Sequence, residues 1–266
     1  MIPRAFIVEW SHRVGWPSLD QVEQDLVLSR LIVEIARDPT LGDELILRGG
    51  TCLHKLHLPV PLRYSEDLDY VRRSGGGIGE VTRSLTALGE RVGMEVGTRV
   101  GPFPKVYLRA PFESGSGRMR IKIEVNTRER VPAREPVRTP YQVDSQWFRG
   151  EANVLTFYTA ELVATKLRAL YQRSKGRDLF DLWLALEHLG LAPADIVECF
   201  SPYRPDGYTA TLAKKNLLAK LKDREFRTDL DPLVPAWPQG YDVDAAADRV
   251  LNGVLPLLPR LGGVKP

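Results

Sequence analysis

Residues 47–53 read Leu-Arg-Gly-Gly-Thr-Cys-Leu, and residues 63–70 read Arg-Tyr-Ser-Glu-Asp-Leu-Asp-Tyr. The carboxylates Asp67 and Asp69 of the second segment are separated by one residue. In a β-strand alternate side chains share a face, so both carboxylates would project together while Leu68 points the other way. Two carboxylates this close repel each other, and Mg²⁺, which prefers oxygen ligands and accompanies phosphates, would relieve the repulsion. The alternative is a hairpin edge with two solvated acids.

The first segment contains a turn of small residues, Gly49, Gly50 and Thr51, at the expected start of a short helix over residues 51–58. Backbone N–H groups at such a turn form a docking point for phosphate. We therefore expect this turn to hold phosphates through its backbone N–H groups and the Thr51 hydroxyl. Lys55, within the same helix, is a further candidate phosphate contact.

The composition is that of an ordinary globular protein. The 266 residues suffice for one large domain or two small ones, and a formal net charge of +3, from 37 basic and 34 acidic residues, does not by itself indicate a nucleic-acid binder. Cys52 and Cys199 form no zinc motif or disulfide framework, and His54 and His57 have no third metal ligand nearby. No stretch approaches the ~20 apolar residues of a membrane helix, and the start of the chain lacks a signal-peptide core. We therefore expect a cytoplasmic protein with reduced thiols.

Residues 118–126 alternate strictly between polar and apolar side chains, which is typical of a strand with one buried face. The expected buried face consists of Ile121, Ile123 and Val125, and the polar face of Arg120, Lys122, Glu124 and Asn126. A polar face of mixed charge suits the floor of a catalytic cleft, so Glu124 is the expected third carboxylate beside Asp67 and Asp69. The alternative is an exposed strand on which Lys122 and Glu124 form an ion pair.

The neighbouring segments predict the other elements of the first half. These are an irregular lead-in over residues 1–17, a helix from Ser18 to about residue 37, a helix over residues 78–92, and paired strands over residues 94–100 and 105–110. Repeated prolines in residues 129–150 disfavour a helix or a central strand. This Arg- and Pro-rich segment is expected to be an extended surface segment and a domain boundary. Its arginines could line an RNA path, or the segment could be a solvated linker.

The second half begins with a helix expected over residues 159–171, which carries Lys166 on or beside its apolar stripe. The Lys166 amine would either extend to solvent or point into a cleft to meet an anion. A second helix, after a glycine break, begins with Arg177, Asp178 and Asp181. The simplest interpretation of these charges is an Arg177–Asp181 ion pair worth ~0.3–0.5 kcal/mol, with Asp178 complementing the helix N-terminus.

The rest of the chain, residues 193–266, is expected to be mostly helical. One basic stretch over residues 210–224 contains Lys214, Lys215 and Lys220. It could contact RNA, although a solvated helix face is the more common situation.

The two halves together resemble the AbiEii/AbiGii toxin family of the polymerase-β-like nucleotidyltransferase superfamily, which includes MenT-like toxins. In that family a Gly-Gly-Thr or Gly-Ser turn precedes an Arg-x-Ser-x-Asp-x-Asp run, and a Thr-x-x-Glu-x-x-Ala-x-Lys helix precedes Arg-Asp-x-x-Asp. The first run matches residues 63–69, and the resemblance covers roughly residues 45–190. The matching positions of the second half are Thr156 or Thr159, Glu161, Lys166, Arg173, Arg177, Asp178 and Asp181. Cys52 and Glu124 depart mildly from the family pattern.

The resemblance implies an α/β fold. A nucleotidyltransferase core with a small mixed sheet and an N-terminal helix is expected in residues 1–150, and a helical domain that completes the active site in residues 151–266. It further implies a toxin of a bacterial toxin–antitoxin or phage-defence system that transfers nucleotides from NTP to RNA in a Mg²⁺-dependent reaction. The expected acceptor is the tRNA 3′ end, whose modification would block translation, and a cognate antitoxin is a further expected partner.

The motifs and the resemblance together assign three sets of site residues. The expected catalytic residues are Asp67, Asp69, Lys166 and Asp181, and the expected metal ligands are Asp67, Asp69 and Glu124. The expected nucleotide-binding residues are Gly49, Gly50, Thr51, Ser65, Lys166 and Arg177. Two alternatives remain open: nucleotidyl transfer to a small molecule or a protein hydroxyl, and a non-catalytic nucleotide- or RNA-binding module.

Overall fold

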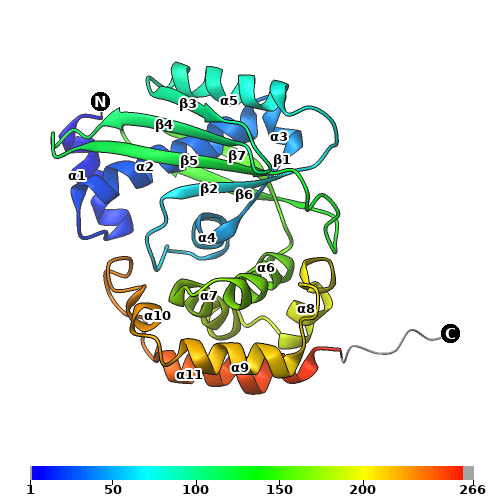
Figure 1. Ribbon diagram of the computed structural model, residues 1–266. Coiled ribbons are helices and arrows are strands. Elements are labelled where there is room, and N and C mark those ends of the chain that lie inside the picture. Colours follow the sequence, from blue (N-terminus) through cyan, green and yellow to red (C-terminus); the bar gives the residue numbers. More distant parts are fainter. Residues whose placement is uncertain (1, 260–266) are drawn as a thin grey trace. The chain divides into compact units, whose positions relative to one another are not determined.

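The computed structural model describes residues 2–259, and the chain divides into two compact units between Phe157 and Tyr158 (Figure 1). The first unit contains a mixed sheet with helices, and the second is helical in its described part. The expected boundary at residue 150 lies inside a strand, β7 (Arg149–Thr156). The α/β fold class is confirmed, with a mixed sheet in the first half and helices in the second.

A 7-stranded sheet with the order β3-β4-β5-β2-β1-β7-β6 forms the first unit. Its other strands are β1 (Leu45–Arg48), β2 (Asp67–Arg72), β3 (Glu95–Arg99), β4 (Lys105–Pro111), β5 (Arg118–Asn126) and β6 (Val137–Asp144). β2 pairs parallel with β5 and antiparallel with β1. The strand that carries the two acids therefore lies within the sheet, between two partners that fix its position.

The two faces of β5 differ as the sequence predicts. Ile121, Ile123 and Val125 are at most 1% exposed, whereas the intervening side chains are exposed or half-buried. Helix α5 (Gly79–Arg91) covers this apolar face closely, because a Cβ on its Gly89 would lie 2.5 Å from Cδ2 of Leu108, the partner of Ile121 on β4. The polar side chains consequently lie on the face away from α5.

The start of the chain is helical, so the expected irregular lead-in is wrong. Helix α1 (Arg4–Val14) buries Ile7, Trp10 and Val14, whose spacing of three and four residues places them on one side of the helix. The indole Nε1 of Trp10 donates to Oδ1 of Asp25, 2.9 Å away in α2 (Leu19–Arg37). Ser18 caps α2, because its hydroxyl accepts a hydrogen bond from the Asp20 amide.

Lys55 is part of the core of the first unit, so its predicted phosphate contact is wrong. It follows the short helices α3 (Leu41–Glu44) and α4 (Gly49–Cys52), in a π-helical segment, Leu53–His57. Its Nζ lies 2.6 Å from Oδ1 of Asp25 and 2.9 Å from Oγ of Ser29. Burial disfavours the charged amine, but the Asp25 carboxylate more than offsets this and raises the pKa of Lys55.

The segment over residues 129–150 contributes two parts to the sheet, namely strand β6 (Val137–Asp144) and the first two residues of β7. Strand β6 lies at the edge of the sheet and pairs only with β7. Pro140 is accommodated there because an edge strand has one side whose N–H groups need no ladder partner. The prediction that prolines exclude a central strand is therefore confirmed.

The second unit is built on the antiparallel pair of helices α6 (Thr159–Gln172) and α7 (Gly176–Glu187). The remaining helices are α8 (Pro193–Glu198), α9 (Ala210–Lys220), α10 (Arg224–Thr228) and α11 (Val243–Arg249), with short 3₁₀ or π segments at Ser201–Tyr203, Val250–Val254 and Leu255–Leu257. Within residues 2–259 no helix combines the length and the apolar character needed to cross a membrane.

Lys220 does not belong to a free basic helix face. Its amine donates to the carbonyl oxygens of Tyr171 and Arg173, each 2.9 Å away, and to that of Leu170. It therefore binds the last carbonyls of α6, which have no partner within that helix. Lys214 and Lys215 are exposed on α9.

His57 makes the first unit sensitive to acid. Burial lowers its pKa to about 4, below the value near 6.5 of an exposed histidine. The unfolded chain therefore takes up a proton between these pH values that the folded chain does not, so stability is lost as the pH falls through this window. The unfolding free energy is measured with urea at pH 7 and at pH 5. Its loss from pH 7 to pH 5 should be smaller in His57→Gln than in the unchanged protein by up to about 2 kcal/mol. An identical pH dependence in both proteins would contradict this assignment.

Candidate functional site

Asp67 and Asp69 are the first and third residues of β2 and lie on one face of the sheet, while Leu68 between them is fully buried on the other. The Asp67 side chain is 37% exposed, and Asp69 is half-buried. In the parallel pairing with β5, Asp67 lies opposite Lys122 and Asp69 lies opposite Glu124. The structure thus brings the three predicted carboxylates to one face of two adjacent strands.

Lys122 lies among these acids. Its Nζ is 3.0 Å from Oδ2 of Asp67 and 3.5 Å from Oε2 of Glu124. Partial burial disfavours the charged amine, but the hydrogen bond to Asp67 and the charges of Asp67, Asp69 and Glu124 together raise the pKa of Lys122. The ammonium is therefore held by the carboxylate cluster. Glu124 also binds a second amine, because its Oε2 lies 3.0 Å from Nζ of Lys105.

The electrostatics of Asp69 reflect the same crowding. Burial raises the pKa of Asp69, the charges of Lys122 and Arg48 reduce this rise, and those of Asp67 and Glu124 add to it. Arg48 is the β1 residue opposite Asp69, and its guanidinium also lies 2.6 Å from Glu129. An additional cation beside Asp69 would therefore stabilise its charged form.

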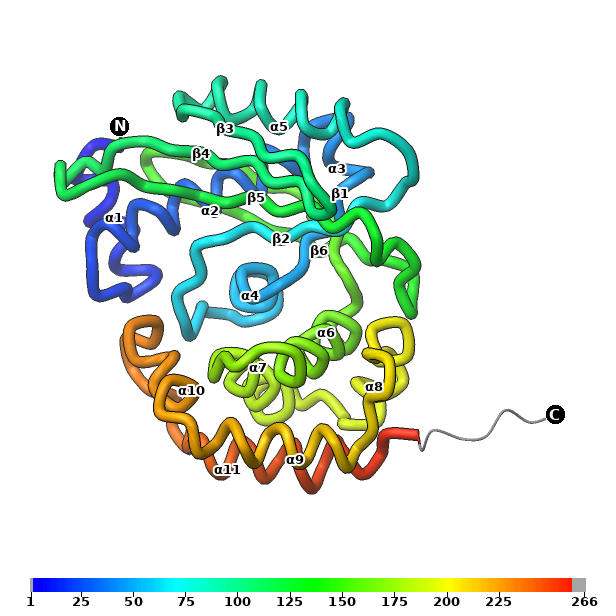
Figure 2. Tube along the Cα trace, viewed as in Figure 1, coloured from blue at the N-terminus to red at the C-terminus, as the bar shows by residue number. Residues whose placement is uncertain are grey.

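The glycine turn is packed directly against the acids. The chain leaves β1 into α4 and returns to β2 (Figure 2). Gly49 has a φ of +83°, and a Cβ there would lie 2.7 Å from Oδ2 of Asp69. Gly50 leaves room for the guanidinium of Arg63, which a Cβ would overlap. Both glycines are required by close approach, and Gly49 also by its left-handed backbone.

The Thr51 side chain ties this turn to β2. Thr51 is 2% exposed, and its hydroxyl lies 2.5 Å from the carbonyl oxygen of Asp67 and 2.8 Å from Oγ of Ser65. The hydroxyls of Thr51 and Ser65 are therefore engaged with each other and with the acid-bearing strand. What the turn offers to a phosphate is its backbone, as expected for Gly49 and Gly50.

Two of the three predicted carboxylates are suited to binding a metal ion. Among residues 2–259 no three His, Cys, Asp or Glu side chains are gathered closely enough to hold a metal ion, so the expected third ligand, Glu124, does not complete such a set. Its carboxylate binds Lys105 and Lys122 instead. The pair Asp67 and Asp69 still fits Mg²⁺, which is commonly bound through one or two carboxylates together with substrate phosphates and water.

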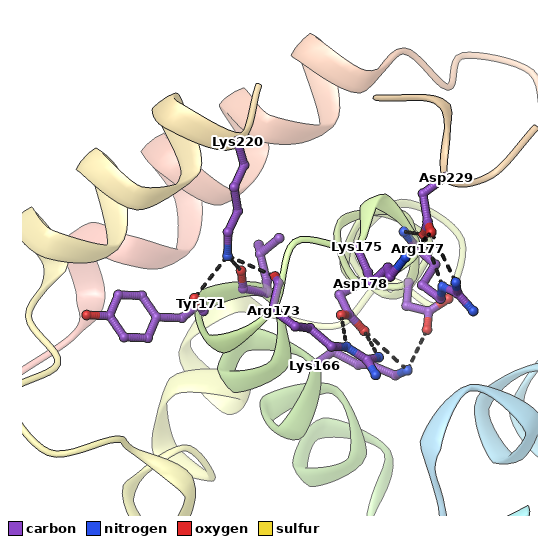
Figure 3. Close-up of polar contacts among 10 residues, drawn as sticks. Lys166, Tyr171, Arg173, Lys175, Arg177, Asp178, Lys220 and Asp229 are labelled. Atoms are coloured by element: carbon purple, nitrogen blue, oxygen red, sulfur yellow. Dashed lines mark hydrogen bonds and ion pairs between the residues drawn. The ribbon is translucent and has the colours of Figure 1, made fainter. Parts of the chain in front are cut away.

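Lys166, Asp178 and Asp181 of the second unit form a buried ionic cluster, to which the partly exposed Arg173 also belongs (Figure 3). Nζ of Lys166 lies 2.8 Å from Oδ2 of Asp181 and 3.7 Å from Oδ1 of Asp178. The side chains of both aspartates are 0% exposed, and that of Lys166 is 5% exposed. Arg173 binds Asp178 with both arms of its guanidinium, at 2.6 and 2.7 Å. Lys166 therefore points into the protein to meet anions, and two positive charges balance two negative ones.

Arg177 has a different partner from the one its spacing suggested. Its guanidinium binds Asp229 in a bidentate pair with both contacts at 3.0 Å, and Lys175 lies 3.4 Å from the same carboxylate. Burial of Asp229 is outweighed by its hydrogen bonds and ion pairs with Arg177, so the pKa of Asp229 is lowered. Glu161, another motif residue, is buried and accepts a hydrogen bond of 2.6 Å from the Tyr203 hydroxyl.

Sequence reasoning missed Lys105, Arg48 and Asp229 as parts of these sites. Lys105 could have been found, because strict alternation in two paired strands puts it on the same face as Glu124 once their register is known. Asp229 lies in a segment without periodicity, far along the chain from Arg177, and no local signal marks it.

Comparisons with known proteins find a matching family model and similar solved structures. The family model for nucleotidyl transferase AbiEii toxins of type IV toxin–antitoxin systems matches residues 30–249. Among solved structures, the chain is similar to MenT4, a nucleotidyltransferase toxin from Mycobacterium tuberculosis H37Rv, with a TM-score of 0.57, 19% identity and coverage of 97% of this chain and 90% of that one. It is also similar to JHP933 from Helicobacter pylori, with a TM-score of 0.54, 16% identity and coverage of 91% and 93%. A search of curated proteins gives no match.

The two structural likenesses establish the fold, and the family model covers most of the chain. The chain therefore belongs to the AbiEii family of nucleotidyltransferase toxins of type IV toxin–antitoxin systems.

Proposed function

We propose that this nucleotidyltransferase transfers nucleotides from an NTP to the 3′ hydroxyl of an RNA, with the tRNA 3′ end as acceptor, and thereby blocks translation. The observation that carries the proposal is the placement of Asp67 and Asp69 on one face of β2, directly against the Gly49–Gly50 turn. Its setting would be the bacterial cytoplasm, in a toxin–antitoxin or phage-defence system with a cognate antitoxin.

In the proposed reaction the RNA 3′ oxygen attacks the α-phosphorus of the NTP. A new phosphorus–oxygen bond forms, the bond to the bridging oxygen breaks, pyrophosphate leaves, and the proton of the hydroxyl passes to solvent. Asp67 and Asp69 would hold Mg²⁺, which supplies charge neutralisation at the phosphates and a lower pKa for a bound hydroxyl. Burial, together with the charges of Asp67 and Glu124, raises the pKa of Asp69, and a cation bound at this pair would offset both effects.

The remaining residues have supporting roles in this proposal. The backbone N–H groups of the glycine turn bind phosphate, and Ser65 fixes the turn through its contact with Thr51. Glu124 acts through Lys122 and Lys105, which it binds. In the second unit Asp181 orients the Lys166 amine at 2.8 Å, and Lys166 and Arg177 are the residues proposed to contact phosphate.

Removing one charge from the acid pair should abolish transfer without unfolding the protein. We expect Asp67→Asn to lower the labelling of tRNA by about 100-fold or more, because the variant keeps the shape of the side chain but loses the charge that binds the cation. The measurement incubates the protein with labelled NTPs, Mg²⁺ and total tRNA. Glu80→Gln, which alters an exposed acid on α5, is the matched control and should label at the rate of the unchanged protein.

Four results of this assay would count against the proposal in different ways. Unlabelled tRNA in the presence of all four NTPs would contradict an RNA acceptor. A label recovered in a small molecule or a protein would identify that molecule as the acceptor instead. NTP binding without turnover would indicate a non-catalytic module. Labelling by Asp67→Asn at the rate of the unchanged protein would contradict the site.

The role of Lys166 in nucleotide transfer can be tested separately from its contribution to the stability of the folded protein. Lys166→Met removes the ammonium from Asp181 inside the protein and should lower the unfolding free energy by about 3–5 kcal/mol. The double variant Lys166→Met/Asp181→Leu replaces the pair with apolar side chains and should recover most of that stability. Transfer should remain about 100-fold or more below that of the unchanged protein in both variants. Recovery of transfer together with stability in the double variant would show that the cluster is only structural.

A further inference from the structure

The sheet face that carries Asp67 and Asp69 continues across β5 and β4 as a surface with many positive charges. This basic sheet face consists of Lys105, Tyr107, Arg109, Arg118, Arg120 and Lys122. Arg118 and Arg120 are exposed, and the other four are half-buried. The apolar residues that alternate with them, such as Leu108 and Ile121, are fully buried on the opposite face. The hydrophobic core therefore packs on the opposite face of these two strands, and the basic sheet face is not part of it.

Tyr107 lies at the centre of the basic sheet face. The guanidinium of Arg120 lies 4.5 Å from the centroid of its ring, and that of Arg109 lies 5.4 Å away. These cation–π contacts hold both arginines above the sheet in fixed positions. A guanidinium whose position is already fixed loses less conformational freedom when it binds an anion.

The two arginines also repel each other. Arg109 and Arg120 are direct cross-strand partners of β4 and β5, and like charges at such positions destabilise a sheet. Among residues 2–259 neither Arg109 nor Arg120 forms an ion pair. Glu95 on β3 is the cross-strand partner of Arg109, and the charge of Arg109 adds a small part to the lowering of the pKa of Glu95, which is due mainly to Arg118. Glu95 itself forms its ion pair with Arg118. The positive charge of Arg109 and Arg120 is therefore left for an external anion.

This positive charge is continuous with the acid pair. Tyr107 is the cross-strand partner of Lys122, and Lys122 lies 3.0 Å from Asp67. Adjacent strands are about 4.8 Å apart, so a chain of phosphates bound along the basic sheet face would end beside the strand that carries the carboxylates. All of these residues belong to one unit of the structure.

We propose that the basic sheet face binds the phosphate backbone of the acceptor RNA and leads its 3′ end to Asp67 and Asp69. This inference rests on the proposed function and assigns the acceptor to particular residues. Phosphates at Arg109 and Arg120 would be bound by the planar guanidinium fork, and their negative charge would relieve the cross-strand repulsion. The triphosphate of the NTP carries the same chemistry, so the experiment has to separate the two ligands.

The test compares two double variants that remove the same charge from opposite faces of one sheet. Arg109→Gln/Arg120→Gln alters the basic sheet face. Arg83→Gln/Arg91→Gln alters two exposed arginines of α5, which covers the other face, and serves as the matched control. For each protein the Kd for tRNA without NTP is measured at several salt concentrations, together with the KM values for tRNA and NTP. Thermal unfolding checks the fold.

For Arg109→Gln/Arg120→Gln we expect the Kd and KM for tRNA to rise about tenfold or more, and the slope of log Kd against log salt to fall by about 1–2. The KM for NTP should change less than about twofold. The unfolding temperature should be unchanged or higher, because a like-charge pair has been removed. The control variant should stay within about twofold of the unchanged protein in every quantity.

Three results would overturn the inference. Equal weakening of tRNA binding by both double variants would mean that overall charge matters and this face does not, and unchanged tRNA binding by the Arg109 and Arg120 variant would exclude the face directly. A rise in the KM for NTP alone would assign the face to the triphosphate. If the unchanged protein binds tRNA through this face but labels another acceptor, the proposed function fails while the RNA-binding assignment stands.

Discussion

The mutual repulsion of Asp67 and Asp69, held on one face of a strand inside the sheet, is the constraint on which the first unit depends. The strand cannot separate them, because Leu68 between them is fully buried and the register on both sides is fixed by β1 and β5. The structure compensates with positive charge: Lys122 lies 3.0 Å from Asp67, and Arg48 reduces the rise in the pKa of Asp69. The positive charges thus allow the protein to fold with both carboxylates on one face, and the binding of a further cation there is still favourable.

The local backbone is shaped by the same constraint. Only glycine can occupy position 49, since its φ is +83° and a Cβ would collide with the carboxylate of Asp69. Thr51 then anchors the turn to the carbonyl of Asp67. In the second unit an independent balance of charge operates, in which the buried acids Asp178 and Asp181 are compensated by Arg173 and Lys166.

Periodicity and motif together predicted much of the fold and of the candidate site. The alternation of residues 118–126 predicted the buried and polar faces of β5, and the spacing of Asp67 and Asp69 predicted their common face, because both depend only on the local geometry of a strand. Helix α1 was missed because its buried side chains, Ile7 and Trp10 among them, are few and separated by charged residues.

The partners of the charged residues could not be predicted in the same way. Arg177 binds Asp229, Lys220 binds the end of α6, and Lys55 binds Asp25, and each pair joins elements far apart in the sequence. The spacing of apolar residues along the sequence does not indicate which charged residues will form such long-range ionic contacts. Residues 129–150 were predicted to be an extended surface segment because their prolines disfavour a central strand. Strand β6 forms within this segment because an edge strand tolerates Pro140.

The most direct test of the acid pair as a metal site is the affinity of the protein for Mn²⁺, measured by the electron paramagnetic resonance signal of free Mn²⁺. Asp67→Asn and Asp69→Asn should each weaken Mn²⁺ binding about tenfold or more relative to the unchanged protein, while Glu80→Gln on α5 should have no effect. If both aspartate variants remain folded and bind Mn²⁺ as tightly as the unchanged protein, the two carboxylates of β2 are not a metal site.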